Sequence, residues 1–154
     1  MKQIPVIFWT GTGNTQMMAD AVAEAINAAG AEAVVKNISE ITADEAAGYD
    51  ALALGCPAMG AEVLEECEFE PFFTELEGKL AGKKVAIFGS YGWGGSYMQD
   101  WEARVKDAGA TLVADGVLAL GAPDDEAMAK LTEATQKTAF RFSEGQFFSE
   151  ALAL

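Results

Sequence analysis

Neutral hydrogen-bond donors and glycines alternate in one short stretch of the sequence, Thr10-Gly11-Thr12-Gly13-Asn14-Thr15. The glycines allow the backbone to turn tightly, and the hydroxyl and amide groups can bind an anion. The stretch follows an apolar run and opens a helical pattern. The first N–H groups of that helix would therefore face it with the positive end of the helix dipole behind them. Since the stretch contains no Lys or Arg, it suits a phosphate held by uncharged donors.

The spacing of the glycines in this stretch excludes two common kinds of phosphate-binding loop. A nucleoside triphosphatase loop reads G-x-x-x-x-G-K-[ST], and this stretch has neither that spacing nor the lysine. A dinucleotide fingerprint needs a third glycine three residues after Gly13, where the chain has Gln16. The motif is compatible with the monophosphate of a mononucleotide. A plain strand-to-helix connection is the alternative.

Two further glycine-rich stretches carry large planar or polarisable side chains. The first runs from Gly55 to Glu62 and the second from Gly89 to Tyr97. Rings and thioethers stack favourably on aromatic ligands. We therefore expect a flat ligand to be gripped by the large side chains of these stretches, namely Met59, Tyr91, Trp93 and Tyr97. For Trp93, ordinary partial burial is the alternative.

Composition excludes several classes of function. The 154 residues include 24 acidic and 10 basic side chains, a formal charge of −14 that would repel nucleic acid. The acidity suits basic patches on partner proteins, or merely keeps the protein soluble. The absence of histidine rules out Ser-His-Asp triads and His-ligated zinc. Cys56 and Cys67 are too few for a disulfide framework, and no signal peptide or spanning segment is evident. These features predict a reduced, cytoplasmic protein without membrane contact.

Alternating strands and helices must position the three stretches. The predicted strands are Ile4–Trp9, Ala33–Ile38, Ala51–Gly55, Lys83–Gly89 and a broken fifth made of Thr111–Val113 and Val117–Leu120. The predicted helices run from the phosphate stretch to about Ala28, and over Thr42–Ala47, Pro71–Leu80, Met98–Ala108 and Asp124 to about Phe142. Such a chain forms a doubly wound α/β domain with a parallel sheet covered on both faces. Ligands of this fold bind at the carboxyl ends of the strands.

The three stretches together resemble the flavodoxin family, specifically its short-chain type from anaerobic bacteria. Thr10 to Thr15 is similar to that family's [ST]-G-T-G-N-T loop, and residues 55–60 and 88–94 are similar to its two flavin-flanking loops. The resemblance implies a flavodoxin-like three-layer sandwich with a five-stranded parallel sheet in the order 2-1-3-4-5. It spans about residues 2–140, so we expect an FMN-binding domain over 1–140. Residues 141–154 are then expected to form an extension of the last helix and a tail.

The resemblance also implies a cofactor, flavin mononucleotide (FMN), and residues that bind it. Thr10, Thr12, Asn14 and Thr15 would hold the phosphate with the amides of Gly11 and Gly13. Met59 and Trp93 would sandwich the ring, Glu62 would accept from its N3–H, and the Gly60 carbonyl would meet N5–H after one electron is taken up. The pyrimidine end would be lined by Tyr91, Gly92 and the amides around Trp93. The expected cofactor-binding set is completed by Pro57, Ala58, Ala61, Ser90 and Gly94.

A low-potential one-electron carrier is the function that this resemblance implies, and we expect a monomer that works with basic-surfaced redox proteins. Anionic reduced flavin beside a phosphate in a −14 protein is electrostatically unfavourable. The semiquinone/hydroquinone couple is therefore the expected working couple. Ala61 stands where relatives have Asp, Ser or Gly-like residues, and its Cβ is expected to weaken semiquinone stabilisation.

Three alternatives remain at this point. The first is an NAD(P)H-dependent quinone or nitro reductase on the same fold, which would need an open flavin face. The second is a receiver domain, which would need clustered acids where the chain has Thr10 and Cys56. The third is an FMN-binding module without a redox function, such as a sensor or a storage module.

Overall fold

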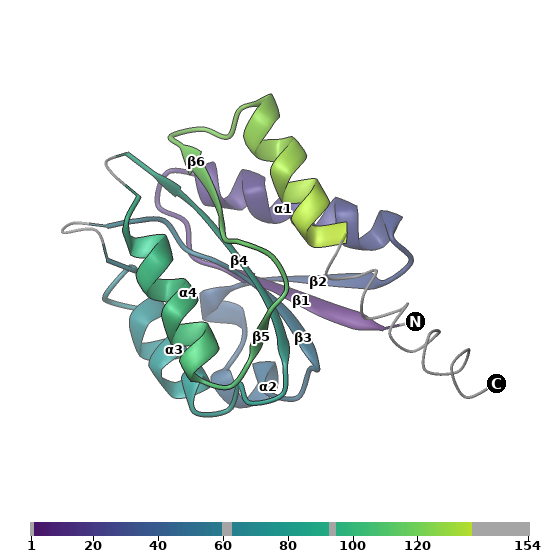
Figure 1. The fold of residues 1–154 in the computed structure, drawn as a ribbon, viewed down its shortest axis with the longest axis vertical. Coiled ribbons are helices and arrows are strands. Elements are labelled where there is room, and N and C mark those ends of the chain that lie inside the picture. The colour runs from purple at the N-terminus through teal and green to yellow at the C-terminus, as the bar shows by residue number, and fades with distance from the viewer. Residues whose placement is uncertain (1, 60–62, 93–94, 137–154) are drawn as a thin grey trace.

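The computed structural model describes residues 2–59, 63–92 and 95–136 of the chain (Figure 1). Its strands are β1 (Gln3–Phe8), β2 (Glu32–Asn37), β3 (Ala51–Gly55), β4 (Lys84–Tyr91), β5 (Thr111–Leu112) and β6 (Val117–Leu120). Its helices are α1 (Asn14–Ala28), α2 (Ala43–Ala46), α3 (Phe69–Glu77) and α4 (Tyr97–Asp107), with a 3₁₀ turn at Ile38–Glu40. A further helix spans residues 125–136. The strand–helix alternation predicted from the sequence is confirmed.

All pairings within the sheet are parallel, and the strand order is β2-β1-β3-β4-β5. The short strands β5 and β6 both pair with β4, β5 with its first residues and β6 with its last. They therefore form one interrupted edge strand, as the sequence pattern predicted. The predicted order 2-1-3-4-5 is confirmed by these pairings.

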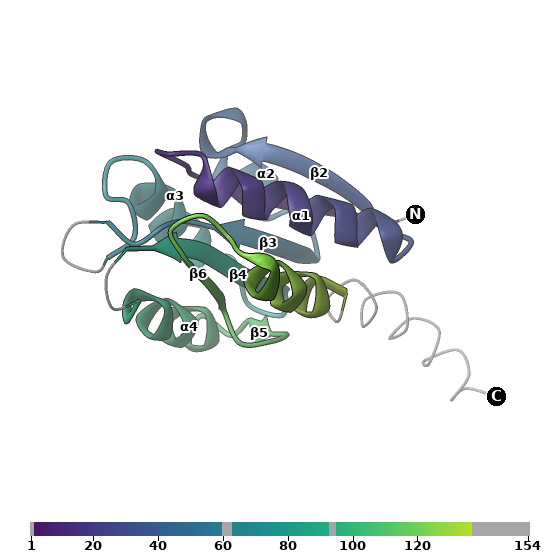
Figure 2. The same cartoon turned by 90° about the horizontal axis from the view of Figure 1, so that it is seen from above.

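Apolar side chains cover both faces of the sheet. On one face, Ile4, Val6 and Phe8 of β1 pack with α1 and with Leu131 of the helix at 125–136. On the other face, residues of β3 and β4 pack with α3 and α4 around Trp101. The two views show these helices on opposite sides of the sheet (Figures 1 and 2). The carboxyl ends of the parallel strands consequently open at one edge that neither layer covers.

An ion-pair cluster joins α3 to α4. The Arg104 guanidinium lies 2.6 Å from a Glu70 oxygen and 2.9 Å from a Glu77 oxygen. It also lies 4.8 Å from the centre of the Phe73 ring. The hydrogen bonds that Arg104 donates to Glu77 and Glu70 raise the pKa of its guanidinium, so the cluster stays charged. The cluster aligns α3, and with it the loop that leads from β3 into α3.

Several predicted element boundaries were wrong by a few residues. Helix α3 begins at Phe69 rather than Pro71 and ends at Glu77 rather than Leu80. Its first amides are bound by the side chain of Glu65, which starts the helix before the proline. Strand β4 continues to Tyr91, two residues beyond the predicted end, because β6 pairs with these residues.

The last predicted helix is described only in part. Its start is confirmed close to Asp124, whose side chain accepts a hydrogen bond from the Ala127 amide at 2.8 Å. The predicted end at Phe142 and the predicted tail 141–154 lie outside the described residues. Among the helices that the structure describes, none has the length and apolar character needed to cross a bilayer.

Candidate functional site

The loop between β1 and α1 has the geometry of an anion site. Gly13 precedes the helix in a left-handed conformation with φ of 94°, which an L-residue with a Cβ adopts only at a cost. No side chain caps the first turn of α1, and that turn contains no acidic residue. The helix therefore presents its first N–H groups and the positive end of its dipole without a side-chain partner.

The predicted phosphate ligands take different positions in this loop. Gly11, Thr12 and Asn14 line a cavity at the carboxyl edge of the sheet. The Thr10 hydroxyl accepts a hydrogen bond from the Gly13 amide at 3.0 Å, which closes the loop. Thr15 is buried, and its hydroxyl lies 3.3 Å from that of Ser90 on β4. The structure thus brings three of the predicted ligands to the cavity, while Thr10, Gly13 and Thr15 shape the loop.

The cavity has a volume of about 250 Å³ and lies where the loops after β1, β3 and β4 converge. The described residues that line it are all uncharged: Trp9, Gly11, Thr12, Asn14, Pro57, Ala58, Met59, Ser90, Tyr91, Gly92 and Gly121. Nine of these eleven are residues predicted from the sequence to bind the cofactor. Residues from three loops that are distant in sequence therefore form a single site.

Two residues of the cavity were missed as site residues. Trp9 directly follows β1, and its ring lies so close to Gly11 that a Cβ at that glycine would approach it at 3.1 Å. Gly121 follows β6, has φ of 64°, and donates from its amide to the Tyr91 carbonyl at 2.8 Å. Both residues directly follow strands of the sheet. The rule that ligands bind at the carboxyl ends of strands would have included them.

An antiparallel bridge joins Met59 to Val63. The Met59 amide donates to the Val63 carbonyl at 2.8 Å, and the Val63 amide donates back to Met59 at 3.1 Å. Met59 is 39% exposed at the rim of the cavity, as a residue that contacts a ligand would be. Five residues of the predicted cofactor-binding set lie outside the described residues, namely Gly60, Ala61, Glu62, Trp93 and Gly94.

Tyr97 was wrongly predicted to grip the flat ligand. It is 2% exposed, its hydroxyl donates to the Cys56 carbonyl at 2.9 Å, and its ring stacks on Trp101. Tyr97 starts α4 on the face that packs against the sheet, so it belongs to the core. Cys56 is buried as well, and burial raises the pKa of its thiol. The Cys56 thiol is therefore neutral and structural.

The donor set fits FMN. Neutral donors and an uncapped helix N-terminus suit a phosphate, and Trp9, Met59 and Tyr91 offer apolar surfaces to a flat ring. The part of the chain that the structure describes contains no cluster of acidic or cysteine side chains able to hold a metal ion.

Comparison with known proteins agrees with this geometry. Residues 6–140 match the family model described as flavodoxin. The chain is 46% identical to a flavodoxin of Megasphaera elsdenii over 116 residues, covering 75% of this chain and 85% of that protein. It is 46% identical to a flavodoxin of Clostridium beijerinckii over 121 residues, covering 78% of this chain and 88% of that protein.

A solved structure, that of two-electron reduced Megasphaera elsdenii flavodoxin, superimposes with a TM-score of 0.79 at 43% identity. The superposition covers 87% of this chain and 98% of that one. The fold, the family model and the identity over most of each relative point to the same conclusion. The chain belongs to the flavodoxin family, whose members are FMN-binding electron-transfer proteins rather than enzymes.

Proposed function

We propose that this chain carries single electrons between redox proteins with FMN bound in the cavity lined by Trp9, Met59 and Tyr91. The observation that carries the proposal is the uncharged lining of this cavity, next to the uncapped N-terminus of α1. FMN supplies the redox chemistry when bound. The residues of the chain hold its phosphate, cover its ring and set the electrostatic cost of adding electrons.

The phosphate would be held by Thr12, Asn14 and the amides at the start of α1. Thr10 and Thr15 support this loop from within, through the Gly13 amide and the Ser90 hydroxyl. Because the described lining contains no cation, the phosphate keeps its negative charge beside the ring. The roles proposed for Gly60, Glu62 and Trp93 rest on the family resemblance.

The electrostatics favour the lower of the two one-electron couples of FMN as the working couple. Two like charges about 4 Å apart repel by roughly 4 kcal/mol at an effective dielectric of 20, and screening reduces that value. About 1.4 kcal/mol corresponds to 59 mV for one electron. A few kcal/mol of repulsion in a chain of net charge −14 would make the midpoint potential of the second one-electron reduction strongly negative.

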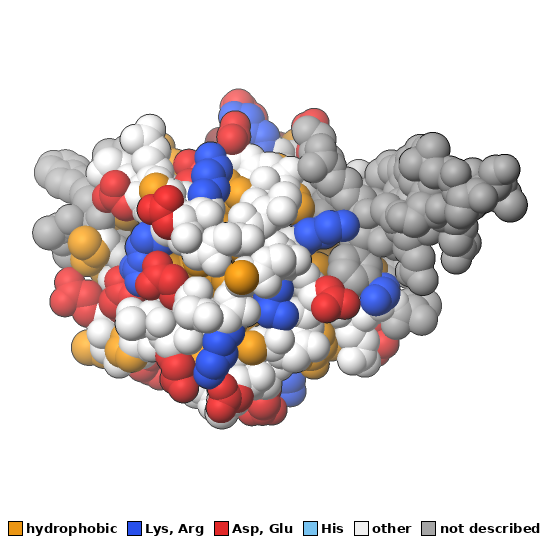
Figure 3. Space-filling model, turned by 60° about the horizontal axis from the view of Figure 1, so that its bottom comes forward, with side chains coloured by type: hydrophobic (Ala, Val, Ile, Leu, Met, Phe, Trp, Pro, Cys, Tyr) orange, Lys and Arg blue, Asp and Glu red, His pale blue; other side chains and the backbone are white. Residues whose placement is uncertain are grey.

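The partners of this carrier are redox proteins, and we propose that their docking surfaces are basic. Acidic side chains outnumber basic ones by 24 to 10 in the chain. On the face shown in Figure 3 the two kinds are interleaved, with acidic side chains along the left and lower margins. Electron transfer to a basic redox protein should therefore slow steeply as salt is added. We also propose a cytoplasmic monomer with reduced thiols, since Cys56 and Cys67 are unpaired in the structure.

The experiment that tests the function is reconstitution followed by anaerobic photoreduction. After mixing with FMN and removal of unbound FMN by gel filtration, the protein should be yellow, and stepwise photoreduction should give two separate one-electron phases in the visible spectrum. A protein that is colourless once unbound FMN has been removed would overturn the proposal. Oxidation of NADPH by the purified protein alone would instead support the reductase alternative, which the family assignment does not favour.

A further inference from the structure

Glu65 is a buried carboxylate that does not line the cofactor cavity. It is 5% exposed, and its two oxygens accept three backbone hydrogen bonds. Oε2 accepts from the Cys67 amide at 2.8 Å, and Oε1 accepts from the amides of Glu68 at 2.7 Å and Phe69 at 2.9 Å. Burial would raise the pKa of Glu65, but these amides outweigh it and lower the pKa. The carboxylate is therefore charged and fully engaged.

The backbone of Glu65 is tied to the start of the same loop. Its amide donates to the Cys56 sulfur at 3.3 Å, and Cys56 directly follows β3. The loop that leaves the sheet at Cys56 thus returns to it at Glu65. Between these two points lie Met59, which lines the cavity, and the Met59–Val63 bridge. Glu65 consequently fixes the return end of the loop that flanks the cavity.

A second connection runs from this segment to the phosphate loop. The Glu68 carboxylate accepts from the indole N–H of Trp9 at 3.2 Å. The Trp9 ring lines the cavity and lies against Gly11. The Glu68 amide is itself bound by the Glu65 carboxylate. Glu65 is therefore connected to both sides of the cavity, to Trp9 through Glu68 and to Met59 through the loop between Cys56 and Glu65.

We propose that Glu65 is a positioning residue for the cofactor. Its carboxylate holds the segment 65–69, so that Met59 and the Trp9 ring keep their places against bound FMN. The inference rests on the proposed function, because it assumes that FMN occupies this cavity. It goes beyond that function in assigning control of the flavin potentials to a residue that does not contact the cofactor.

The test compares Glu65→Gln with Glu66→Gln. Glutamine has the shape of glutamate, but its NH₂ group would face a backbone N–H donor in place of an acceptor oxygen. Glu66 is the adjacent residue and is exposed, so its replacement removes the same charge from the same loop. Two quantities are measured: amide hydrogen exchange of residues 67–69 in the apoprotein, and the two one-electron midpoint potentials at saturating FMN.

Glu65→Gln should speed exchange of these amides at least tenfold. It should also narrow the separation between the two one-electron potentials by at least about 59 mV. That shift corresponds to a tenfold change in the equilibrium constant that relates the three redox states of bound FMN. Glu66→Gln should move both potentials in the same direction and leave their separation unchanged. Equal separations in the two variants would overturn the inference, whereas a wild-type protein that does not bind FMN would overturn the proposed function itself.

A second pair of variants keeps the test decisive if Glu65→Gln does not fold. Glu68→Ala removes the acceptor of the Trp9 indole and leaves the Glu65 carboxylate in place. Glu66→Ala is its matched control. In Glu68→Ala the separation between the two potentials should narrow, by less than the value expected for Glu65→Gln, and in Glu66→Ala it should not change. This result supports the connection through Trp9, and equal separations in the two variants contradict it.

Discussion

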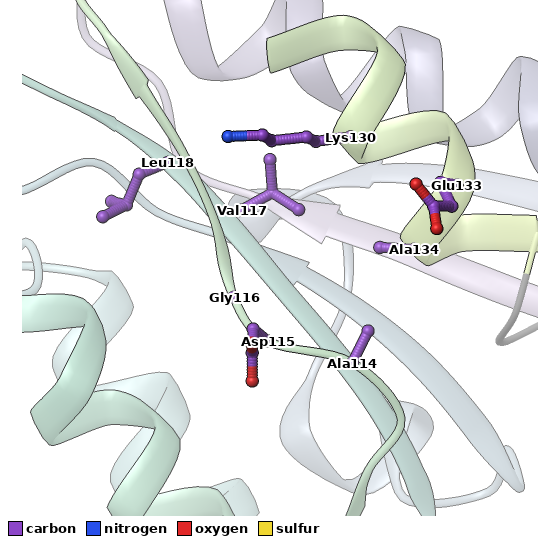
Figure 4. A pocket seen from close by; sticks show the side chains of 8 residues that line it. All are labelled: Ala114, Asp115, Gly116, Val117, Leu118, Lys130, Glu133 and Ala134. Carbon is purple, nitrogen blue, oxygen red and sulfur yellow. The ribbon is translucent and has the colours of Figure 1, made fainter. Parts of the chain in front are cut away.

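Two cavities of this molecule differ in size, place and chemistry. The larger, about 440 Å³, lies between the edge strand β6 and the helix at 125–136, and its lining includes Asp115, Lys130 and Glu133. In Figure 4, Lys130 extends along Val117, while Asp115 points away from it. The smaller, about 250 Å³, lies at the carboxyl ends of β1, β3 and β4, and its described lining is uncharged.

Under the proposed function, volume does not select the binding site. Parallel strands end together at one edge, where their loops and the N-terminus of a helix converge on the same space. The outer side of an edge strand has no such convergence. The larger cavity contains a lysine, yet this cation is already paired with Glu126 at 3.3 Å. We therefore infer that the arrangement of backbone amides and neutral side chains decides where the phosphate binds.

The strongest test of this comparison is a carboxylate placed in each cavity. Thr12→Asp should weaken FMN binding about 100-fold, close to 2.7 kcal/mol, because the new charge would face the phosphate. Ala114→Asp adds the same charge to the larger cavity and should leave the FMN dissociation constant within about twofold. Quenching of flavin fluorescence during titration measures both. Equal losses in the two variants would contradict the assignment of the site.

Acid should lower the free energy of unfolding through Glu65, whose carboxylate holds the loop that flanks the cofactor cavity. Its pKa is lowered in the folded protein, so its contribution to stability is complete above the unfolded value of about 4.3 and is lost as the pH falls through the lower folded value. The contribution is on the order of 2 kcal/mol, as for hydrogen bonds to a charged group. Urea unfolding of the apoprotein between pH 7 and pH 3 measures it. A Glu65→Gln variant with the same pH dependence as the wild type would refute this.

Replacing Ala61 tests the β-turn that the sequence predicts at residues 59–62. If the turn must adopt positive φ at this position after the first electron arrives, the Cβ of alanine costs roughly 1–2 kcal/mol. Ala61→Gly should then raise the first one-electron potential of bound FMN by roughly 40–90 mV. Spectroelectrochemical titration provides the measurement, and an unchanged potential would show that the turn does not require glycine there.

The smallest effect is expected in the larger cavity. Lys130 and Glu126 form an exposed pair one helical turn apart, with side chains 65% and 77% exposed. Lys130→Ala should lower the free energy of unfolding by no more than about 0.5 kcal/mol and should not change FMN affinity. Loss of FMN binding in this variant would indicate that the phosphate binds in the larger cavity and would contradict the assignment of the site to the smaller one.

The amino-acid sequence was enough to predict the layers of the fold and most of the candidate site. Apolar periodicity distinguishes strands from helices because it reflects the spacing of residues that must face a sheet or a core. The loop from Thr10 to Thr15 was predicted because its donors, its glycines and the start of α1 are neighbours in the chain. Nine of the eleven residues that line the cavity follow from this local information and from the family resemblance.

Which side chains are buried, and which hydrogen-bond partners they have, could be learned from the three-dimensional fold alone. Ser90 lies at the end of β4 because β6 pairs with it, and its hydroxyl meets that of Thr15, which is 75 residues away in the chain. Tyr97 is in the core because α4 turns this residue toward Cys56. Backbone geometry depends largely on neighbours in sequence, whereas burial and hydrogen-bond partners depend on segments that folding brings together. The role inferred for Glu65 belongs to this second kind, since its carboxylate gains its importance from the loop and the tryptophan that it connects.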